Sequence, residues 1–277
     1  MPAKSFSKLE TAVNNLVSFW NTNFYKETYI HKDDYSLIKN MLFDDCKSFS
    51  EYKDKYLNKF ENPESNEIFK FHPSLYPVPY CGDLRNAKIF ILSLNPGFDC
   101  DYYHEDDEKF KSALKSNLAQ KFDTEYQLCY LNPEFCWTGS GRYWLKKFSS
   151  LIQYMLKNEM SESYTEALKL LSQNIALLEI VPYHSKSFNF PKYESLTSVQ
   201  VMINFINEII ADKSKKLIIL RKGNELIETK KLITVTSEDE KSHVCVYRHS
   251  ECQSASLSEN SKSGKIIINF LKSKMNV

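Results

Sequence analysis

Residues 87–99 read AKIFILSLNPGFD. An apolar run of strand length ends at Leu94 and is followed at once by Asn95, Pro96 and Gly97. A continuous run of this kind is typical of a strand that is covered on both faces in a parallel sheet. The stretch therefore predicts a buried strand that ends in an amide side chain, just before two residues that favour a turn.

Three further runs share this character. They are NIALLEIVPY at 174–183, KLIILR at 216–221 and HVCVYR at 243–248. Helical patterns lie between and after them, at 141–157, 163–173, 197–213 and 264–275, although the last segment also allows a strand. This alternation predicts an α/β, three-layer domain in which helices flank a central, mainly parallel, four-stranded sheet.

The N-terminal quarter has a different character. Residues 1–70 combine helical spacing of apolar residues with many aromatic and polar side chains. We expect a helical extension over 1–70, packed as a cap on an α/β domain over 71–277. The proline-rich segment HPSLYPVPYCGDL at 72–84 joins the two and should be extended or turn-like.

The chain has 277 residues and a formal net charge of +1, so as a whole it does not attract a polyanion. Residues 213–277 hold 13 Lys and Arg against 7 Asp and Glu, which fits either a phosphate-binding surface or an ordinary solvated one. The seven cysteines lack zinc or iron–sulfur spacing, and we expect no signal peptide and no membrane-spanning run. These features predict a cytoplasmic protein with reduced thiols, and we take a monomer as the expected state.

Polar residues follow each predicted strand. They are Asn95 to Asp99 after the first run, Glu179 and Pro182 to Ser185 in the second, Arg221 to Gly223 after the third, and Arg248 to Ser250 after the fourth. Ligands of open parallel sheets bind outside the carboxyl ends of the strands. Chains also turn there, so one polar strand end indicates little, but four together favour a binding site.

Several of these residues resemble a known family. LSLNPGF at 92–98 is similar to the first motif of the uracil-DNA glycosylase superfamily, nearest to its mismatch-specific, thymine-DNA and single-strand-selective branches. GSGRYWLKKFSSL at 139–151 resembles the Gly-containing loop and aromatic-Trp-Lys helix of those branches. IALLEIVP at 175–182 fits the second core strand, and RHSECQSASLS at 248–258 occupies the place of the last, His- or Asn-containing loop.

The resemblance covers about residues 75–270, and two features depart from it. Ser93 stands where the nearest branches usually have Gly, and the last loop lacks the family's proline and tight spacing. The resemblance implies a DNA partner, a base flipped into a pocket and hydrolysis of its N-glycosidic bond. It implies no metal and no cofactor.

The catalytic candidates are Asn95, Asp99 and His249. An amide such as Asn95 can hold a water without placing a full charge beside the base, although an Asx-type turn would also explain it. Asp99, with Asp101 as a second choice, can act as a general base or can be a turn residue. His249 can donate to the departing base, as in some family members, or can be a surface histidine.

Glu179 is the unusual residue of the predicted pocket. The alignment of LLEIVP places it where an Asn usually reads the edge of uracil. A carboxylate only accepts hydrogen bonds, so Glu179 should repel uracil O4 and favour an exocyclic amine such as cytosine N4. A register error of one or two residues would instead turn it to another face.

The remaining candidates surround this centre. We expect Gly97, Phe98, Tyr102 and His184 to contact the substrate, with Tyr103 as a further aromatic, and Arg221, Lys222, Ser250, Ser254 and Leu257 to contact DNA, Leu257 as a wedge. Core or lid packing explains the aromatics equally well. Tyr143 and Trp144 are expected to pack rather than act.

The sequence therefore predicts a monofunctional DNA glycosylase for a modified or cytosine-type pyrimidine, with defence against phage DNA as a suggested role. Uracil or mismatch repair on the same fold is one alternative. A nucleic-acid-binding module without catalysis is a second. An unrelated α/β hydrolase is a third, which the absence of GxSxG and P-loop motifs weakens.

Overall fold

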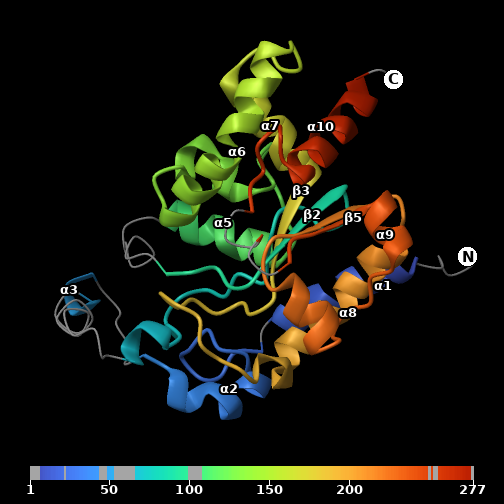
Figure 1. Ribbon diagram of the computed structural model, residues 1–277. Helices are drawn as coiled ribbons and strands as arrows, with labels where there is room; N and C mark the ends of the chain where they lie inside the picture. Colours follow the sequence, from blue (N-terminus) through green and yellow to red (C-terminus); the bar gives the residue numbers. More distant parts are fainter. Residues whose placement is uncertain are drawn as a thin grey trace, which may run out of the picture.

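The computed structural model describes residues 7–21, 23–43, 49–52, 66–98, 108–248, 251 and 255–275. Its centre is a five-stranded sheet in the order β1-β3-β2-β4-β5 (Figure 1). The strands are β1 (Tyr80–Cys81), β2 (Ile89–Ser93), β3 (Ile175–Glu179), β4 (Lys216–Ile219) and β5 (Val244–Val246). The last four run parallel, as their continuous apolar sequences predict.

The sheet has one strand more than the four expected. The additional strand, β1, is only two residues long and pairs antiparallel with β3. It lies in the proline-rich segment at 72–84, where no apolar run marks it in the sequence. Its backbone pairing with β3 places Cys81 beside Leu177, the middle residue of β3.

Helices cover both faces of the sheet, which confirms the α/β class (Figure 1). On one face, α1 (Lys8–Trp20) and α8 (Thr197–Ala211) pack on alternate strand residues such as Phe90 and Leu92. On the other face, α6 (Gly139–Lys157), α7 (Tyr164–Asn174) and α10 (Lys262–Met275) pack on Ile89 and Ile91. Successive strand residues point to opposite faces, so both sides of the sheet must be apolar.

The other helices are α2 (Lys32–Ile38), α3 (Phe49–Tyr52), α5 (Glu108–Leu118), α9 (Ser237–Ser242) and the short helices Lys39–Met41, Asn66–Phe69, Cys129–Leu131, Pro133–Phe135, Tyr193–Ser195 and Glu225–Thr229. The segment at 264–275 is helical within α10 and forms no strand. Within the described ranges, no helix combines the length and apolar character that a bilayer crossing requires.

The N-terminal helices share the core of the sheet. Val13, Leu16 and Trp20 of α1 belong to the same buried cluster as Phe90 and Leu92 of β2. A cap that lies outside the layers is therefore not confirmed, because α1 is part of one helical layer. The domain boundary between residues 70 and 71 stays a prediction.

Candidate functional site

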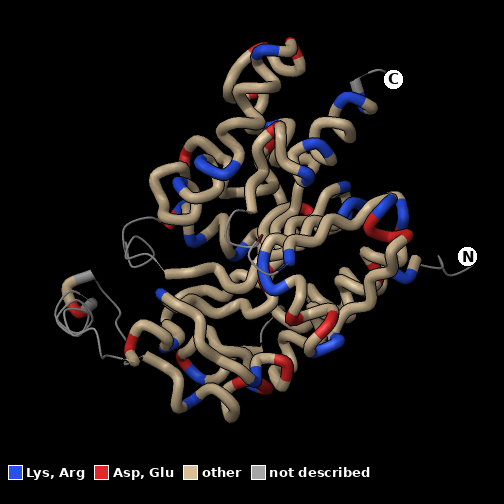
Figure 2. Tube along the Cα trace, viewed as in Figure 1, with Lys and Arg blue, Asp and Glu red and all other residues tan. Residues whose placement is uncertain are grey.

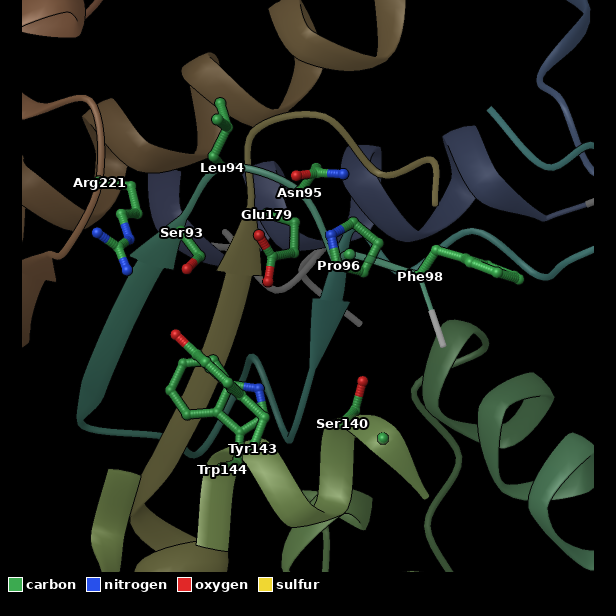
Figure 3. A pocket seen from close by; sticks show the side chains of 12 residues that line it. Ser93, Leu94, Asn95, Pro96, Phe98, Ser140, Tyr143, Trp144, Glu179 and Arg221 are labelled. Carbon is green, nitrogen blue, oxygen red and sulfur yellow. The ribbon is translucent and has the colours of Figure 1, made fainter. Parts of the chain in front are cut away.

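A cavity of about 350 Å³ lies at the carboxyl ends of the parallel strands (Figure 3). We call it the strand-end cavity. Its lining comes from the ends of β2, β3 and β4 and from the start of α6: Ser93, Leu94, Asn95, Pro96, Gly97, Phe98, Gly139, Ser140, Tyr143, Trp144, Glu179 and Arg221. The parallel pairing of β2 and β3 sets Ser93 beside Glu179, so two strand ends present polar side chains to one hollow.

Asn95 lines this cavity and is half-buried. Its Nδ2 donates to Ser185 Oγ at 3.1 Å and to the Tyr183 carbonyl oxygen at 3.5 Å. These partners lie some ninety residues away in the chain, so the side chain does not close a local Asx turn. Because the nitrogen is engaged by the protein, Oδ1 is the atom of Asn95 that can accept a hydrogen bond from a water or a ligand.

His184 contacts the backbone of the Asn95 loop at Gly97 and is not part of the cavity lining. Its Nδ1 lies 2.8 Å from the Gly97 carbonyl oxygen and its Nε2 lies 3.0 Å from that of Tyr76. Burial lowers the pKa of His184 to about 4, so the ring is neutral at pH 7 and donates from one nitrogen only. Gly97 has φ +69°, a left-handed backbone that glycine adopts without strain.

Phe98 also lines the cavity, but one face of its ring packs against another side chain. It stacks on His72 with ring centroids 3.8 Å apart and 4° between the planes. His72 is buried, and burial followed by the proximity of His184 lowers its pKa to about 3. The face of Phe98 that stacks on His72 is therefore closed to a base.

Glu179 ends β3 and is only 6% exposed, although it lines the cavity (Figure 3). Its Oε2 is buried and has no hydrogen-bond partner. Burial, and to a smaller extent nearby Cys81, raises the pKa of Glu179 well above its usual range. The neutral acid is thereby favoured, and it offers a donor as well as an acceptor, unlike the carboxylate that the sequence argument assumed.

The start of α6 forms the opposite wall. Tyr143 is 43% exposed and packs edge-on against buried Trp144 with ring centroids 5.2 Å apart. Partial burial raises the pKa of Tyr143, and a hydrogen bond and the charge of Arg221 oppose this shift. Lys147 Nζ lies 5.6 Å from the Tyr143 ring centroid, so a large aromatic surface and two cations meet at this wall.

The residues predicted from the sequence to contact DNA do not all lie at the strand-end cavity. Arg221 lines the strand-end cavity, whereas the Lys222 ammonium pairs with Glu225. Leu257 is fully buried in the core cluster beneath α6 and α10, so the prediction of a wedge is wrong for this structure: a wedge must project from the surface. Asp99, Tyr102, His249, Ser250 and Ser254 lie outside the described residues, as do Asp101 and Tyr103.

Tyr143 and Ser140 line the cavity and Lys147 lies beside Tyr143, and none of the three is predicted from the sequence as a site residue. Tyr143 and its neighbour Trp144 follow one another on a helix, and only the tertiary structure shows that Trp144 turns inward and Tyr143 outward. Lys147 sits one helical turn after Tyr143, a spacing that places both on one face and was available as a signal.

The described residues contain no group of three or more His, Cys, Asp or Glu side chains placed to hold a metal ion. Four lysines of the C-terminal quarter lie along α10, whereas acidic and basic segments alternate around α9 (Figure 2). Comparisons with models of protein families, with curated proteins and with solved structures found no match to this chain.

Proposed function

We propose that this protein is a DNA glycosylase that hydrolyses the N-glycosidic bond of a pyrimidine flipped into the strand-end cavity. The observation that carries the proposal is the meeting of Asn95 and Glu179 in one cavity at the carboxyl edge of the parallel sheet. The volume of about 350 Å³ lies at the small end of ligand sites, which suits a single planar base. The motif resemblance to the uracil-DNA glycosylase superfamily supports the same reading.

Asn95 would orient the attacking water. Its Nδ2 is held by Ser185 and Tyr183, so Oδ1 has a defined direction and can accept a hydrogen bond from that water. A water held against the sugar carbon reacts faster than a free one because its position and orientation are settled before the reaction. Asp99 and His249 keep the roles predicted for them, as general base and as donor to the leaving base.

The wall at α6 would hold the nucleotide. The exposed ring of Tyr143 can stack on a base, an interaction that contributes about 1–3 kcal/mol per base. Arg221 and Lys147 can attract the phosphates on either side of the flipped nucleotide. The burial of Lys147 and its closeness to Arg221 lower the pKa of Lys147, because the two positive charges repel one another.

A cytosine-type base fits Glu179 in both of its protonation states. Both the acid and the carboxylate can accept a hydrogen bond from the N4 amine of cytosine. Uracil O4 is itself an acceptor, so only the neutral acid can donate a hydrogen bond to it. A second cavity of about 760 Å³ shares Leu94 and Arg221 with the first. This adjoining space would accommodate a substituent on the base, which favours a modified pyrimidine and, as a role, defence against DNA that carries one.

The test is mass spectrometry of bases released from DNA that contains cytosine, 5-hydroxymethylcytosine or uracil. We expect the full chain to release a base and Asn95→Ala to lower the rate about 100-fold or more, with DNA binding retained, because the water loses its position. Asn204→Ala, an exposed change on α8, is the matched control and should act like wild type. Absence of release from all three DNAs, with binding intact, would favour a non-catalytic binding module.

A further inference from the structure

The buried carboxyl of Glu179 suggests more than recognition of the base. Glu179 lines the strand-end cavity, and its Oε2 is buried without a hydrogen-bond partner, which costs the charged carboxylate more than the neutral acid. We propose that Glu179 is a catalytic general acid, which protonates ring nitrogen N3 of a cytosine-type base as that base leaves. This inference rests on the proposed function and names the substrate class and the proton donor of the same site.

The surroundings of Glu179 favour a held proton. The titratable and charged groups that face it are Cys81 from β1, Tyr143 from α6 and Arg221 after β4. Arg221 makes a hydrogen bond to Tyr143, and Cys81 further disfavours the carboxylate. Ser93 at the end of β2 and Asn95 two residues after it are neutral, so burial dominates and favours the protonated carboxyl.

The relative depth of the two side chains matches the shape of a nucleoside. Asn95 is half-buried, whereas Glu179 is only 6% exposed and is the more buried of the two. A pyrimidine joins its sugar through N1 and carries N3 and the C4 substituent on the far side of the ring. With the sugar carbon near Asn95, the N3–C4 edge therefore points inward, towards Glu179.

Cytosine needs such a proton more than uracil does. The uracil ring leaves as an anion that two carbonyl groups stabilise, whereas cytosine has only one. In the proposed step, the Glu179 proton moves to N3 while the N1–C1′ bond breaks and its electron pair goes to N1, so cytosine leaves as a neutral molecule. Water adds its oxygen to C1′, and the proton that this water loses restores the Glu179 acid directly or through solvent.

An amide at position 179 distinguishes a role in proton transfer from a role in hydrogen bonding alone. Glu179→Gln keeps the size, a donor and an acceptor, but it has no proton to transfer. We expect release of 5-hydroxymethylcytosine to fall 100-fold or more, the usual range for loss of a general acid being about 10²–10⁴. Release of uracil, which needs only hydrogen bonds to O4 and N3, should fall less, so the ratio of cytosine-type to uracil release should drop at least tenfold.

The experiment measures single-turnover release from the three DNAs over a range of pH for wild type, Glu179→Gln and the exposed control Glu166→Gln. For wild type, cytosine-type release should fall as pH rises through the pKa of folded Glu179, because the neutral acid is consumed. Glu179→Gln should lack that alkaline decline. The wild-type profile tests the acid even where the variant folds poorly.

Two kinds of failure are distinguishable. No release of any base by the wild-type chain would remove the proposed glycosylase function and this inference with it. Release by wild type with an unchanged ratio of bases in Glu179→Gln, release of uracil alone, or a cytosine-type rate that rises with pH would overturn the acid role and leave the glycosylase proposal intact.

Discussion

At the scale of single residues, burial shifts the pKa values of Glu179 and His184 in opposite directions. Burial lowers the pKa of His184 and raises that of Glu179, so it favours the neutral form of both side chains. Both ring nitrogens of His184 lie within hydrogen-bonding distance of backbone carbonyl oxygens, those of Gly97 and Tyr76, and the neutral ring can donate to one of them. Glu179 lines the strand-end cavity, and its Oε2 is buried without a hydrogen-bond partner.

The raised pKa of Glu179 makes stability depend on pH. The unfolded chain releases this proton above its ordinary pKa of 4.5, whereas the folded chain keeps it to higher pH. The stability that this proton contributes is therefore fully present below the pKa of Glu179 in the unfolded chain. It is lost as pH rises towards the pKa of Glu179 in the folded chain, and it amounts to about 1.4 kcal/mol for each unit by which the pKa is raised. Glu179→Gln should raise the free energy of unfolding near neutral pH.

Urea denaturation at neutral pH and at about pH 4 checks this expectation, because the carboxyl is mostly protonated in both states at the lower pH. The gain from Glu179→Gln should shrink there, and Glu166→Gln should show no such dependence. An equal effect of Glu179→Gln at both pH values would contradict the buried, protonated acid.

At the scale of elements, the start of α6 positions one wall of the cavity. Thr138 Oγ1 accepts a hydrogen bond from the Gly141 backbone nitrogen at 3.0 Å and so caps the helix. A Cβ on Gly141 would lie 2.4 Å from the Phe135 carbonyl oxygen, so only glycine permits the chain to approach this closely. Because Tyr143 lies near the start of α6, the residue at which α6 begins determines the position of Tyr143 at the cavity.

Loss of the cap tests this link. Thr138→Ala should lower the free energy of unfolding by about 1 kcal/mol, the usual cost of a lost N-cap, and should also reduce base release because α6 frays beside the cavity. Thr236→Ala removes the cap of α9 and is the matched control. We expect a comparable loss of stability with normal release, and equal loss of release in both variants would disprove a specific role for α6.

At the scale of the whole molecule, a buried polar network joins the N-terminal region to the site. The Tyr183 hydroxyl donates to Asp34 Oδ2 at 2.6 Å, and Asp34 Oδ1 accepts from the Ser198 backbone nitrogen at 3.2 Å. Asp34 belongs to α2 and Ser198 to the first turn of α8. The carbonyl oxygen of Tyr183 also accepts from Asn95, so the N-terminal helices hold the segment against which Asn95 is oriented.

Tyr183→Phe should therefore affect both stability and the site. It leaves Asp34 buried without one of its donors, which costs about 1–3 kcal/mol of unfolding free energy. Base release should slow as well, because the Tyr183 segment loses an anchor. Tyr164→Phe, at an exposed tyrosine, controls for the chemical change, and stability equal to wild type in Tyr183→Phe would contradict the network.

Much of the framework was predictable because it depends on local sequence. The runs at β2, β3, β4 and β5 are continuous and apolar, and such runs require cover on both faces. The meeting of Asn95 and Glu179 also followed from the rule that parallel strands bring their carboxyl ends to one edge. The strand β1 did not follow, because two residues in a proline-rich segment carry no periodic signal.

The sequence by itself determined the α/β class, the four parallel strands and the edge at which Asn95 and Glu179 lie, since hydrophobic runs and strand direction are written into short stretches of chain. Only the tertiary structure decided that Leu257 is buried, that Tyr143 faces outward and that the N-terminal helix belongs to a layer of the sheet. Only the tertiary structure also shows the burial that raises the pKa of Glu179. Burial and partners come from segments far apart in the chain, so solvent exposure and pKa are properties of the packed molecule and of no single stretch.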